Sequence, residues 1–214
     1  TFQNASPGSG DFTNNGTINM TTFNLAVNIG GTLTTGTITG TGDTISLNGA
    51  AGIVVNNTVS GGTVTLLTSA TGTITQTGGT ISSSTFNINA GTGDIGPLNI
   101  ASTAIGTITQ TGTGGITLTN SLALTSNGVI AAGSGGFSLT DTAGGAGAIN
   151  ITNTITTSGQ IVLSGAGGTD SGIALGASLS GGSVTLTSTG TGAITQCSGT
   201  ITGTALTINA GSGN

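Results

Sequence analysis

The sequence of 214 residues has no lysine, arginine or histidine, and its five acidic residues are all aspartates, which gives a formal net charge of −5. The chain therefore has no usual general base near neutral pH, no imidazole metal ligand, no amine nucleophile and no cationic clamp for a phosphate or carboxylate. These absences exclude most enzyme classes, and we expect no catalytic, cofactor-binding or metal-binding residue. They also argue against nucleic acid as a partner, because lysine and arginine supply most of the affinity for its phosphates.

Several sequence signals are missing as well. No run of about 20 apolar residues is present, so we expect neither a membrane-spanning helix nor membrane insertion. The first residues lack the basic region and apolar core of a signal peptide. Cys197 is the only cysteine, so no internal disulfide can form. We interpret Cys197 as a small, nearly apolar side chain in the repeat position that Thr77 occupies in the related segment described below.

Glycine and short apolar units dominate what is present. The chain has 43 glycines, and hydrophobic residues make up 34% of it. Ile, Leu, Val and Phe recur at every second position in short units separated by glycine, which is the period of β-strands with one buried face. This apolar content disfavours a disordered low-complexity chain.

The sequence repeats itself at two scales. Residues 61–93 align without a gap to residues 181–213, at an offset of 120 residues. A shorter period appears as pairs of apolar residues two positions apart, which divide the 183 residues from Phe23 to Leu206 into eight intervals, a mean of about 23 residues. The pairs are Phe23/Leu25, Ile45/Leu47, Val64/Leu66, Phe86/Ile88, Ile116/Leu118, Phe137/Leu139, Ile161/Leu163, Val184/Leu186 and Leu206/Ile208.

This period predicts an all-β fold, a parallel β-helix (β-solenoid) of about 9–10 coils of roughly 23 residues with three short strands per coil. A β-sandwich would not explain why one sequence motif recurs at a regular interval. We expect residues 23–214 to form a single solenoid domain and residues 1–22, with Phe2, Phe12 and Met20, to form an irregular first coil or a docking arm. The interval of 30 residues from Phe86 to Ile116 is interpreted as one enlarged coil, with Pro97 at a corner or in an outward loop.

One glycine motif resembles a nucleotide-binding fingerprint. Gly91, Gly93 and Gly96 have the Gly-x-Gly-x-x-Gly spacing, which in a dinucleotide site opens a helix and is followed by an acidic residue about 20 positions later. The sequence that follows begins with proline, is rich in β-branched residues and is interrupted by glycine, so it does not favour a helix. It also has no acidic residue at that distance. We therefore interpret these glycines as a corner of the solenoid.

The aspartates stand singly in turn sequences, so we expect them to cap turns. A calcium-binding β-roll needs tandem nine-residue repeats, which this sequence does not have. Coiling that brings separate carboxylates together stays an open alternative. The five residues are Asp11, Asp43, Asp94, Asp141 and Asp170.

Threonine and asparagine carry the remaining surface signals. The threonine run of residues 32–44 is compatible with a flat Thr-x-Thr row of the ice-binding kind, although the outward side of a solvated strand explains it more simply. Asparagine columns near Asn87, Asn89 and Asn209 are expected to hydrogen-bond along the stack. Five Asn-x-Ser/Thr sequons occur, as composition alone predicts, at Asn4, Asn15, Asn19, Asn56 and Asn150.

The phrases FNINAGTGDIGPLNI (86–100), LTINAGSGN (206–214) and the repeated GTITQ or GAITQ resemble the repeats of filamentous-haemagglutinin-type adhesins of bacterial cell surfaces. The resemblance covers nearly the whole chain and is compositional and periodic. It implies a right-handed parallel β-helix, exported to the cell surface or beyond, that acts as an adhesin stalk or fibre. It carries over no catalytic residue, and the absence of Lys, Arg and Glu favours a specialised fibre segment.

These patterns together predict a structural protein. We expect a segment or subunit of an extracellular or cell-surface fibre that is not an enzyme and whose partner is itself, through end-to-end stacking of coils and lateral association. Neither end has the polar or charged cap of a soluble solenoid, which favours such stacking. The alternative is a binding module of the ice-binding or glycan-adhesin type that uses a threonine-rich face. No host ligand is indicated, because Trp and Tyr are absent.

Overall fold

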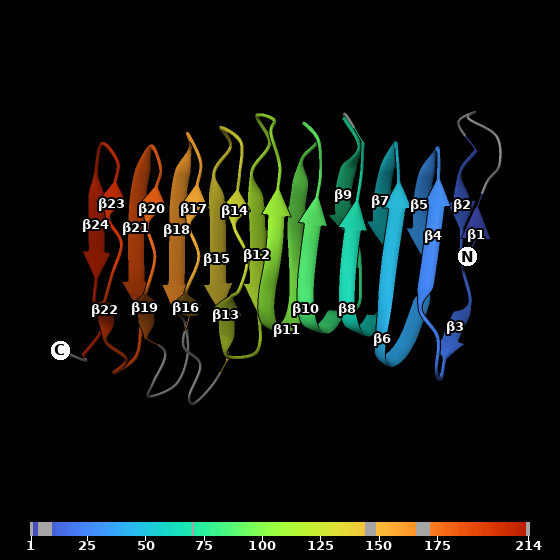
Figure 1. Ribbon diagram of the computed structural model, residues 1–214, viewed down its shortest axis with the longest axis horizontal. Helices are drawn as coiled ribbons and strands as arrows, with labels where there is room; N and C mark the ends of the chain where they lie inside the picture. The colour runs from blue at the N-terminus through green and yellow to red at the C-terminus, as the bar shows by residue number, and fades with distance from the viewer. Residues whose placement is uncertain (1, 4–9, 70, 144–148, 166–171, 213–214) are drawn as a thin grey trace.

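The computed structural model describes residues 2–3, 10–69, 71–143, 149–165 and 172–212. These residues form 24 β-strands and no helix, and every pairing between strands is parallel. The strands stack coil upon coil into a rod, with the N-terminus at one end and the C-terminus at the other (Figure 1). The structure thus confirms the parallel β-solenoid.

The N-terminal coils end with β11, and some of their strands are long. Four strands of 9–15 residues bend around a corner of the coil, namely β6, β8, β10 and β11. The strands are β1 (Phe2–Gln3), β2 (Phe12–Thr13), β3 (Thr17–Met20), β4 (Leu25–Ile29), β5 (Thr32–Thr35), β6 (Thr37–Gly49), β7 (Gly52–Val55), β8 (Val59–Leu67), β9 (Thr73–Gln76), β10 (Ile81–Asn89) and β11 (Ile95–Thr109).

The C-terminal coils begin with β12, and none of their strands exceeds six residues. Each of these coils has three separate strands, as the sequence predicts. The strands are β12 (Ile116–Asn120), β13 (Leu124–Ser126), β14 (Ile130–Ala131), β15 (Phe137–Asp141), β16 (Ile149–Ile151), β17 (Ile155–Thr156), β18 (Gln160–Gly165), β19 (Ile173–Leu175), β20 (Leu179–Ser180), β21 (Ser183–Ser188), β22 (Ile194–Gln196), β23 (Ile201–Thr202) and β24 (Leu206–Asn209).

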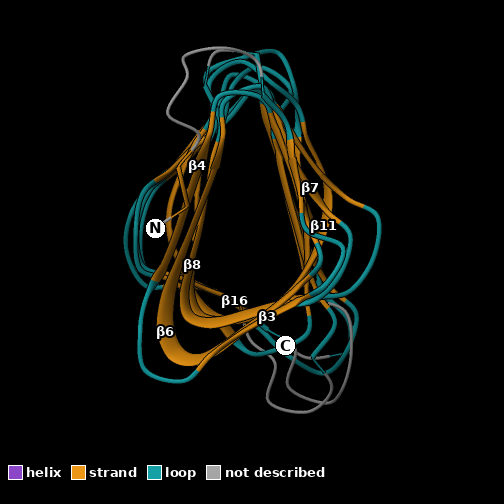
Figure 2. Cartoon of the chain, turned by 90° about the vertical axis from the view of Figure 1, so that its right-hand side faces the viewer, coloured by secondary structure: helices purple, strands orange, loops and turns teal. Residues whose placement is uncertain are grey.

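Viewed along the rod, the coils superimpose as a triangle (Figure 2). Face A, on the left, carries β1, β4, the second parts of the bent strands, and β14, β17, β20 and β23. Face B, on the right, carries β2, β5, β7, β9, the start of β11, and β12, β15, β18, β21 and β24. Face C, below, carries β3, the first parts of the bent strands, and β13, β16, β19 and β22.

Columns of identical or similar apolar side chains fill the triangle. Because the strands stack in register, each inward residue lies on the inward residue of the coil before it. The face B column runs from Leu33 to Val184 with every member buried, and the face A column runs from Val27 to Leu179 in the same way. Each fully buried Val, Leu, Ile or Phe contributes about 1.5–3 kcal/mol relative to exposure. The core is therefore the sum of many equivalent layers.

Strand pairing corrects the length of the coil. Eight coil-to-coil steps connect Leu25 to Gln196, so 171 residues give a mean of about 21 residues per coil, where the apolar pairs had given 23. The enlarged coil between Phe86 and Ile116 is wrong, because Phe86 pairs with Ile105 and Ile116 pairs with Ile95. Pro97 lies within β11, where the register shifts between Ile95 and Leu98, and not in an outward loop.

The apolar motif changes face at β11. Val64 and Phe86 stack in the column that starts at Leu25, whereas their counterparts in the repeat, Val184 and Leu206, stack in the face B column. From Phe86 the chain thus makes one full coil to Ile105 and then crosses to the next face to reach Ile116. As a result, the second copy of the repeated motif lies on face B, one side of the triangle further along the chain than the first copy.

A corner column lies inside the junction of faces B and C, and its chemistry also changes at β11. In the N-terminal coils its members are Ile18, Ile38, Val59, Ile81 and Ile100, and in the C-terminal coils they are Asn120, Asp141, Gly165 and Ser188. Asn120, Asp141 and Ser188 are all buried. An apolar column is therefore continued by a polar one.

Small residues let the bent strands turn from face C to face A. Gly40, Gly61, Ser83 and Ser102 stack at this bend, and the buried hydroxyls of Ser83 and Ser102 lie 2.7 Å apart. A Cβ at Gly61 would lie 2.9 Å from Cδ1 of Ile45, so a larger residue there would push this core side chain aside. The bend is thus kept by residues that leave room for the core.

Candidate functional site

The glycine motif of residues 91–96 lies between two strands and not before a helix. Gly91 and Gly93 belong to the bend that joins β10 to β11, and Gly96 lies within β11. Gly93 is buried against the coil before it, where a Cβ would collide with the Gly72 carbonyl. The close backbone approach that requires this glycine is made by a stacked coil. The interpretation as a solenoid corner is confirmed for Gly91 and Gly93 and is wrong for Gly96, which lies within a strand.

The aspartates remain apart from one another. Asp11 Oδ1 accepts a hydrogen bond from the Thr32 amide in the next coil at 2.7 Å, and Asp141 Oδ1 accepts one from the Ala143 amide at 2.8 Å. Asp141 thus caps its own turn, as predicted, whereas Asp11 connects two coils. Asp43 and Asp94 lie singly, and Asp170 lies outside the described residues. Within the described part of the chain, no three potential metal ligands lie close enough together to hold an ion.

Asp141 is the most deeply buried of the aspartates that the structure describes. Asp141 lies in the corner column with 1% of its surface exposed, and its Oδ2 atom has no hydrogen-bond partner. Burial raises the pKa of this carboxyl, and the hydrogen bond from Ala143 opposes the rise. The residue was identified from sequence only as a turn aspartate, because a polar side chain inside the coil does not follow the alternating pattern.

Glutamine side chains connect neighbouring coils. Gln110, 2% exposed, donates to the carbonyls of Gly93 and Gly114 at 3.2 and 2.9 Å and accepts a bond from the Gly133 amide at 2.8 Å. Gln76 donates to the Gly79 carbonyl at 2.9 Å and accepts from the Asn99 amide at 2.7 Å. Each glutamine closes its own turn and holds the next coil. Sequence comparison aligned Gln76 with Gln196 but indicated no role for them and missed Gln110.

The asparagine columns are present in part. The Asn48 side chain donates to Asn28 Oδ1 at 2.9 Å, which makes one amide ladder between coils. Asn87 and Asn209 instead donate to Thr65 and Thr187 of the preceding coil, both at 3.4 Å. Stacking bonds therefore form, but mostly between asparagine and threonine.

The sequons and the cysteine lie in ordinary positions for a solenoid. Asn15 and Asn19 are exposed in the first coil, while Asn56 accepts a bond from Thr77 Oγ1 at 2.5 Å. Asn150 is half-buried in β16, and Asn4 lies outside the described residues. Cys197 is a free, exposed residue whose amide bonds to the carbonyl of Leu175, as the amide of Thr77 bonds to that of Val55.

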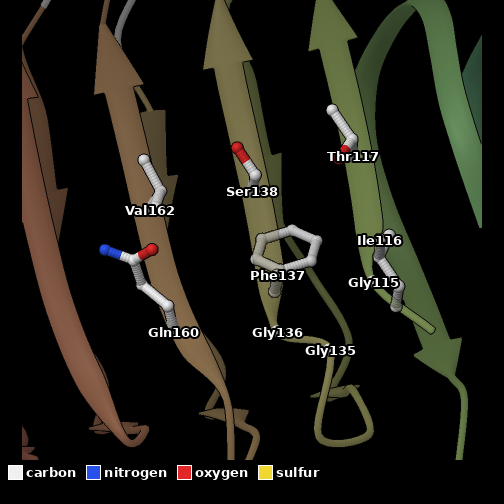
Figure 3. Close-up of a pocket in the computed structure, with 9 residues that line it drawn as sticks. All are labelled: Gly115, Ile116, Thr117, Gly135, Gly136, Phe137, Ser138, Gln160 and Val162. Carbon is white, nitrogen blue, oxygen red and sulfur yellow. The ribbon is translucent and has the colours of Figure 1, made fainter. Parts of the chain in front are cut away.

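Among the described residues, two shallow hollows can be examined for chemistry. One, of about 80 Å³, lies at the start of β12, β15 and β18, and Figure 3 shows the side chains of Ile116, Phe137 and Gln160 around it. The other, of about 290 Å³, lies over the small residues of the bend, with Leu122 at its rim. No titratable side chain lines either hollow. Neither offers a nucleophile with a base beside it, which catalysis of the serine or cysteine type requires.

The most regular chemistry of the surface lies on the outer side of face B. The threonine run of residues 32–44 does not form one flat row, because it turns the corner at Gly36: Thr32 and Thr34 face outward on face B, and Thr37 and Thr39 lie on face C. Two adjacent columns of outward residues, eight of the ten with a hydroxyl group, instead lie over β12, β15, β18, β21 and β24. The first column is Thr117, Ser138, Val162, Thr185 and Thr207, and the second is Thr119, Thr140, Ser164, Thr187 and Asn209.

No family model, curated protein or solved structure matches this chain. Among the described residues, no helix of the length and apolarity needed to cross a membrane is found.

Proposed function

We propose that this chain is a structural segment or subunit of an extracellular or cell-surface fibre, an adhesin-like stalk or self-assembling filament without catalysis. The rod of in-register coils supports this role, because its length grows by one strand spacing, about 4.8 Å, with each coil. The sequence resemblance to filamentous surface adhesins supports the location. The side-chain inventory, which has no usual general base or amine nucleophile, supports a role outside catalysis.

The observation that carries the proposal is the open coil at β22–β24. Leu206 and Ile208 point along the face B columns but are 50% and 54% exposed, whereas Val184 and Leu186 directly beneath them are each 1% exposed. Among the described strands, β24 has one neighbour, β21. The apolar columns and the strand ladder thus continue from coil to coil as far as β24, where both have no further partner among the described residues.

A further coil placed on this end would satisfy both features. It would bury the side chains of Leu206 and Ile208, and its backbone would pair with β24. Gln196 has a side-chain atom available for the same contact. Its Nε2 donates to the Gly199 carbonyl at 2.9 Å and closes the turn. Within the described part of the chain no group donates to its Oε1, and the same atom of Gln76 accepts a hydrogen bond from the next coil. We propose that this coil is either the continuation of a longer chain or the first coil of a second copy.

The opposite end of the rod fits this contact. Phe12 and Ile18 of the first coil are half-buried and begin two apolar columns, and the column that Phe12 begins is the one that ends at Leu206. A second copy stacked in register would continue that column across the joint. Lateral association of rods through their uncharged faces is a second contact of the same fibre.

Electron microscopy and sedimentation of the purified chain test self-assembly. We expect filaments or end-to-end oligomers that lengthen with protein concentration, and we expect Leu206→Asp to shorten them because its carboxylate would be buried at the joint. Thr207→Asp is the matched control, since Thr207 lies beside Leu206 in β24 but faces outward. Dispersed monomers at every concentration, or equal shortening by both variants, would overturn the self-assembling form of the proposal.

A further inference from the structure

The two outward columns on face B form a regular two-dimensional array, which we name the hydroxyl array. Its ten residues are Thr117, Ser138, Val162, Thr185 and Thr207 in one column and Thr119, Thr140, Ser164, Thr187 and Asn209 in the other. Each strand contributes two residues that are separated by one buried residue. Figure 3 shows Thr117, Ser138 and Val162 in a row across three neighbouring strands.

The array has constant spacing in both directions. The four pairings that connect β12 to β24 run residue by residue without a bulge. Neighbouring strands lie about 4.8 Å apart, and two residues along a parallel strand span about 6.6 Å. Outward groups therefore repeat at regular intervals both along each strand and from coil to coil.

The side chains of the array are held in place. Threonine and valine branch at Cβ, which restricts them to few rotamers. Gln160 donates to Thr185 Oγ1 at 3.2 Å, and Asn209 donates to Thr187 Oγ1 at 3.4 Å, so two members are fixed by bonds between coils. The array thus presents the hydroxyl groups of threonine and serine, with Val162 and Asn209 as its two exceptions. Such a surface can hold a layer of water molecules in one arrangement without paying the entropy of ordering long side chains.

The chemistry of the array selects among partners. It contains no charged residue, and Asp141, at the end of β15, is buried on the inner side. An anionic or cationic partner would find no complement on it. It contains no aromatic ring on which a sugar could stack. A neutral, periodic partner fits these features, and an ordered water lattice is neutral and periodic in both directions.

We propose that the hydroxyl array of face B binds ice. This activity goes beyond a fibre role and does not depend on it, because the array lies on the side of the rod and the stacking surface lies at its end. Bound to the array, the first water layer would match both the column spacing and the strand spacing. Growth of the crystal at that plane would then require the front to curve around the adsorbed rod.

Thermal hysteresis and inhibition of ice recrystallisation, measured on the whole chain, test the proposal. We expect both activities in the unmodified protein and loss of most of the hysteresis in Thr140→Tyr, because the ring would stand above the flat array between Thr119 and Ser164. Thr125→Tyr is the matched control: Thr125 is also half-buried and outward on a strand, but it lies on face C. We expect this control to keep the activity of the unmodified protein, and circular dichroism should show the same fold for both variants.

A second pair of variants separates the surface groups. Thr140→Val keeps the shape and removes the hydroxyl, and Thr140→Ser keeps the hydroxyl and removes the methyl group; we expect each to reduce hysteresis less than Thr140→Tyr. The proposal is overturned by the absence of hysteresis and recrystallisation inhibition at millimolar protein, or by equal losses in Thr140→Tyr and Thr125→Tyr. Retention on microcrystalline cellulose or lateral bundling of rods, without activity on ice, would overturn it in favour of a polysaccharide or a second copy.

Discussion

The N-terminal and C-terminal coils share one triangular plan but turn the corners of the triangle differently. In the N-terminal coils the corner column consists of isoleucine and valine, and the strand continues through small residues from face C to face A. In the C-terminal coils the same column consists of Asn120, Asp141, Gly165 and Ser188, and the strands are short and separate. The contrast shows that the faces are fixed by the apolar columns, while the corners tolerate two different chemistries.

The two corner chemistries stabilise the coil by different means. A buried isoleucine contributes through the removal of apolar surface from water, about 1.5–3 kcal/mol for the whole side chain. A buried polar side chain contributes only when its hydrogen bonds are made, as when Asn120 accepts from the Ser102 amide at 2.9 Å or Ser188 donates to the Gly192 carbonyl at 2.7 Å. Where such a bond is missing, as at Asp141 Oδ2, burial is unfavourable. We therefore expect the N-terminal coils to be the more stable part.

The largest effect is expected from Ile81→Ala in the N-terminal corner column. Ile81 is fully buried, so the substitution should lower the free energy of unfolding by about 2–5 kcal/mol. Ser188→Ala in the C-terminal part of the column should cost only about 0.5–1.5 kcal/mol, since it removes a hydrogen bond and little apolar surface. Urea denaturation of both variants measures the difference. Equal losses would show that the two corners are energetically alike.

A smaller loss is expected from Gln110→Ala at the boundary of the two regions. The substitution leaves the buried carbonyls of Gly93 and Gly114 and the amide of Gly133 without this partner, which we expect to cost about 1–3 kcal/mol. Gln196→Ala, measured on dispersed monomers, is the control, because Gln196 is exposed and holds no coil beyond its own turn in the described part of the chain. Hydrogen exchange should show faster opening of β11 and β14 in the first variant only. Faster exchange in both variants would contradict the proposed connection of coils by Gln110.

The smallest effect is expected from Asp141→Asn, and it depends on pH. Burial raises the pKa of Asp141 above its value in the unfolded chain, so the folded state holds the proton more tightly. Stability should be highest below the unfolded pKa, fall as the pH rises through the folded pKa, and then level off. Asp141→Asn should remove this fall and gain on the order of 1 kcal/mol at neutral pH.

The matched substitution for this profile is Asp94→Asn, in an exposed aspartate of the N-terminal coils. Thermal unfolding across the acidic and neutral range gives the profiles of both variants and of the unmodified chain. An unchanged pH dependence in Asp141→Asn would show that the buried carboxyl does not contribute to the difference between the two regions.

The sequence was sufficient to predict a solenoid of stacked coils but not to predict which face of the coil each strand occupies. Alternation at Val64 and Leu66 gives the inward side chains, and the period gives the coil. Every face has the same alternation, however, so the pattern cannot tell which face a strand occupies, and the change of face at β11 appears in sequence as one long interval. Asp141 and Gln110 were missed as interior groups because a polar residue inside a coil has no periodic signal. The hydroxyl array was missed because its columns form only when the register of five strands is known.

The change of face at β11 places the two copies of the repeated motif on different sides of the rod. Thr65 and Thr185 occupy the same position in the two copies of the motif, and the solenoid places the first on face A and the second on face B. A partner that reads the outward residues of the motif would meet it at two different angles around the axis. The surroundings are not the same, however, because Ser46 and Asn87 flank Thr65 in the stack, whereas Val162 and Thr207 flank Thr185.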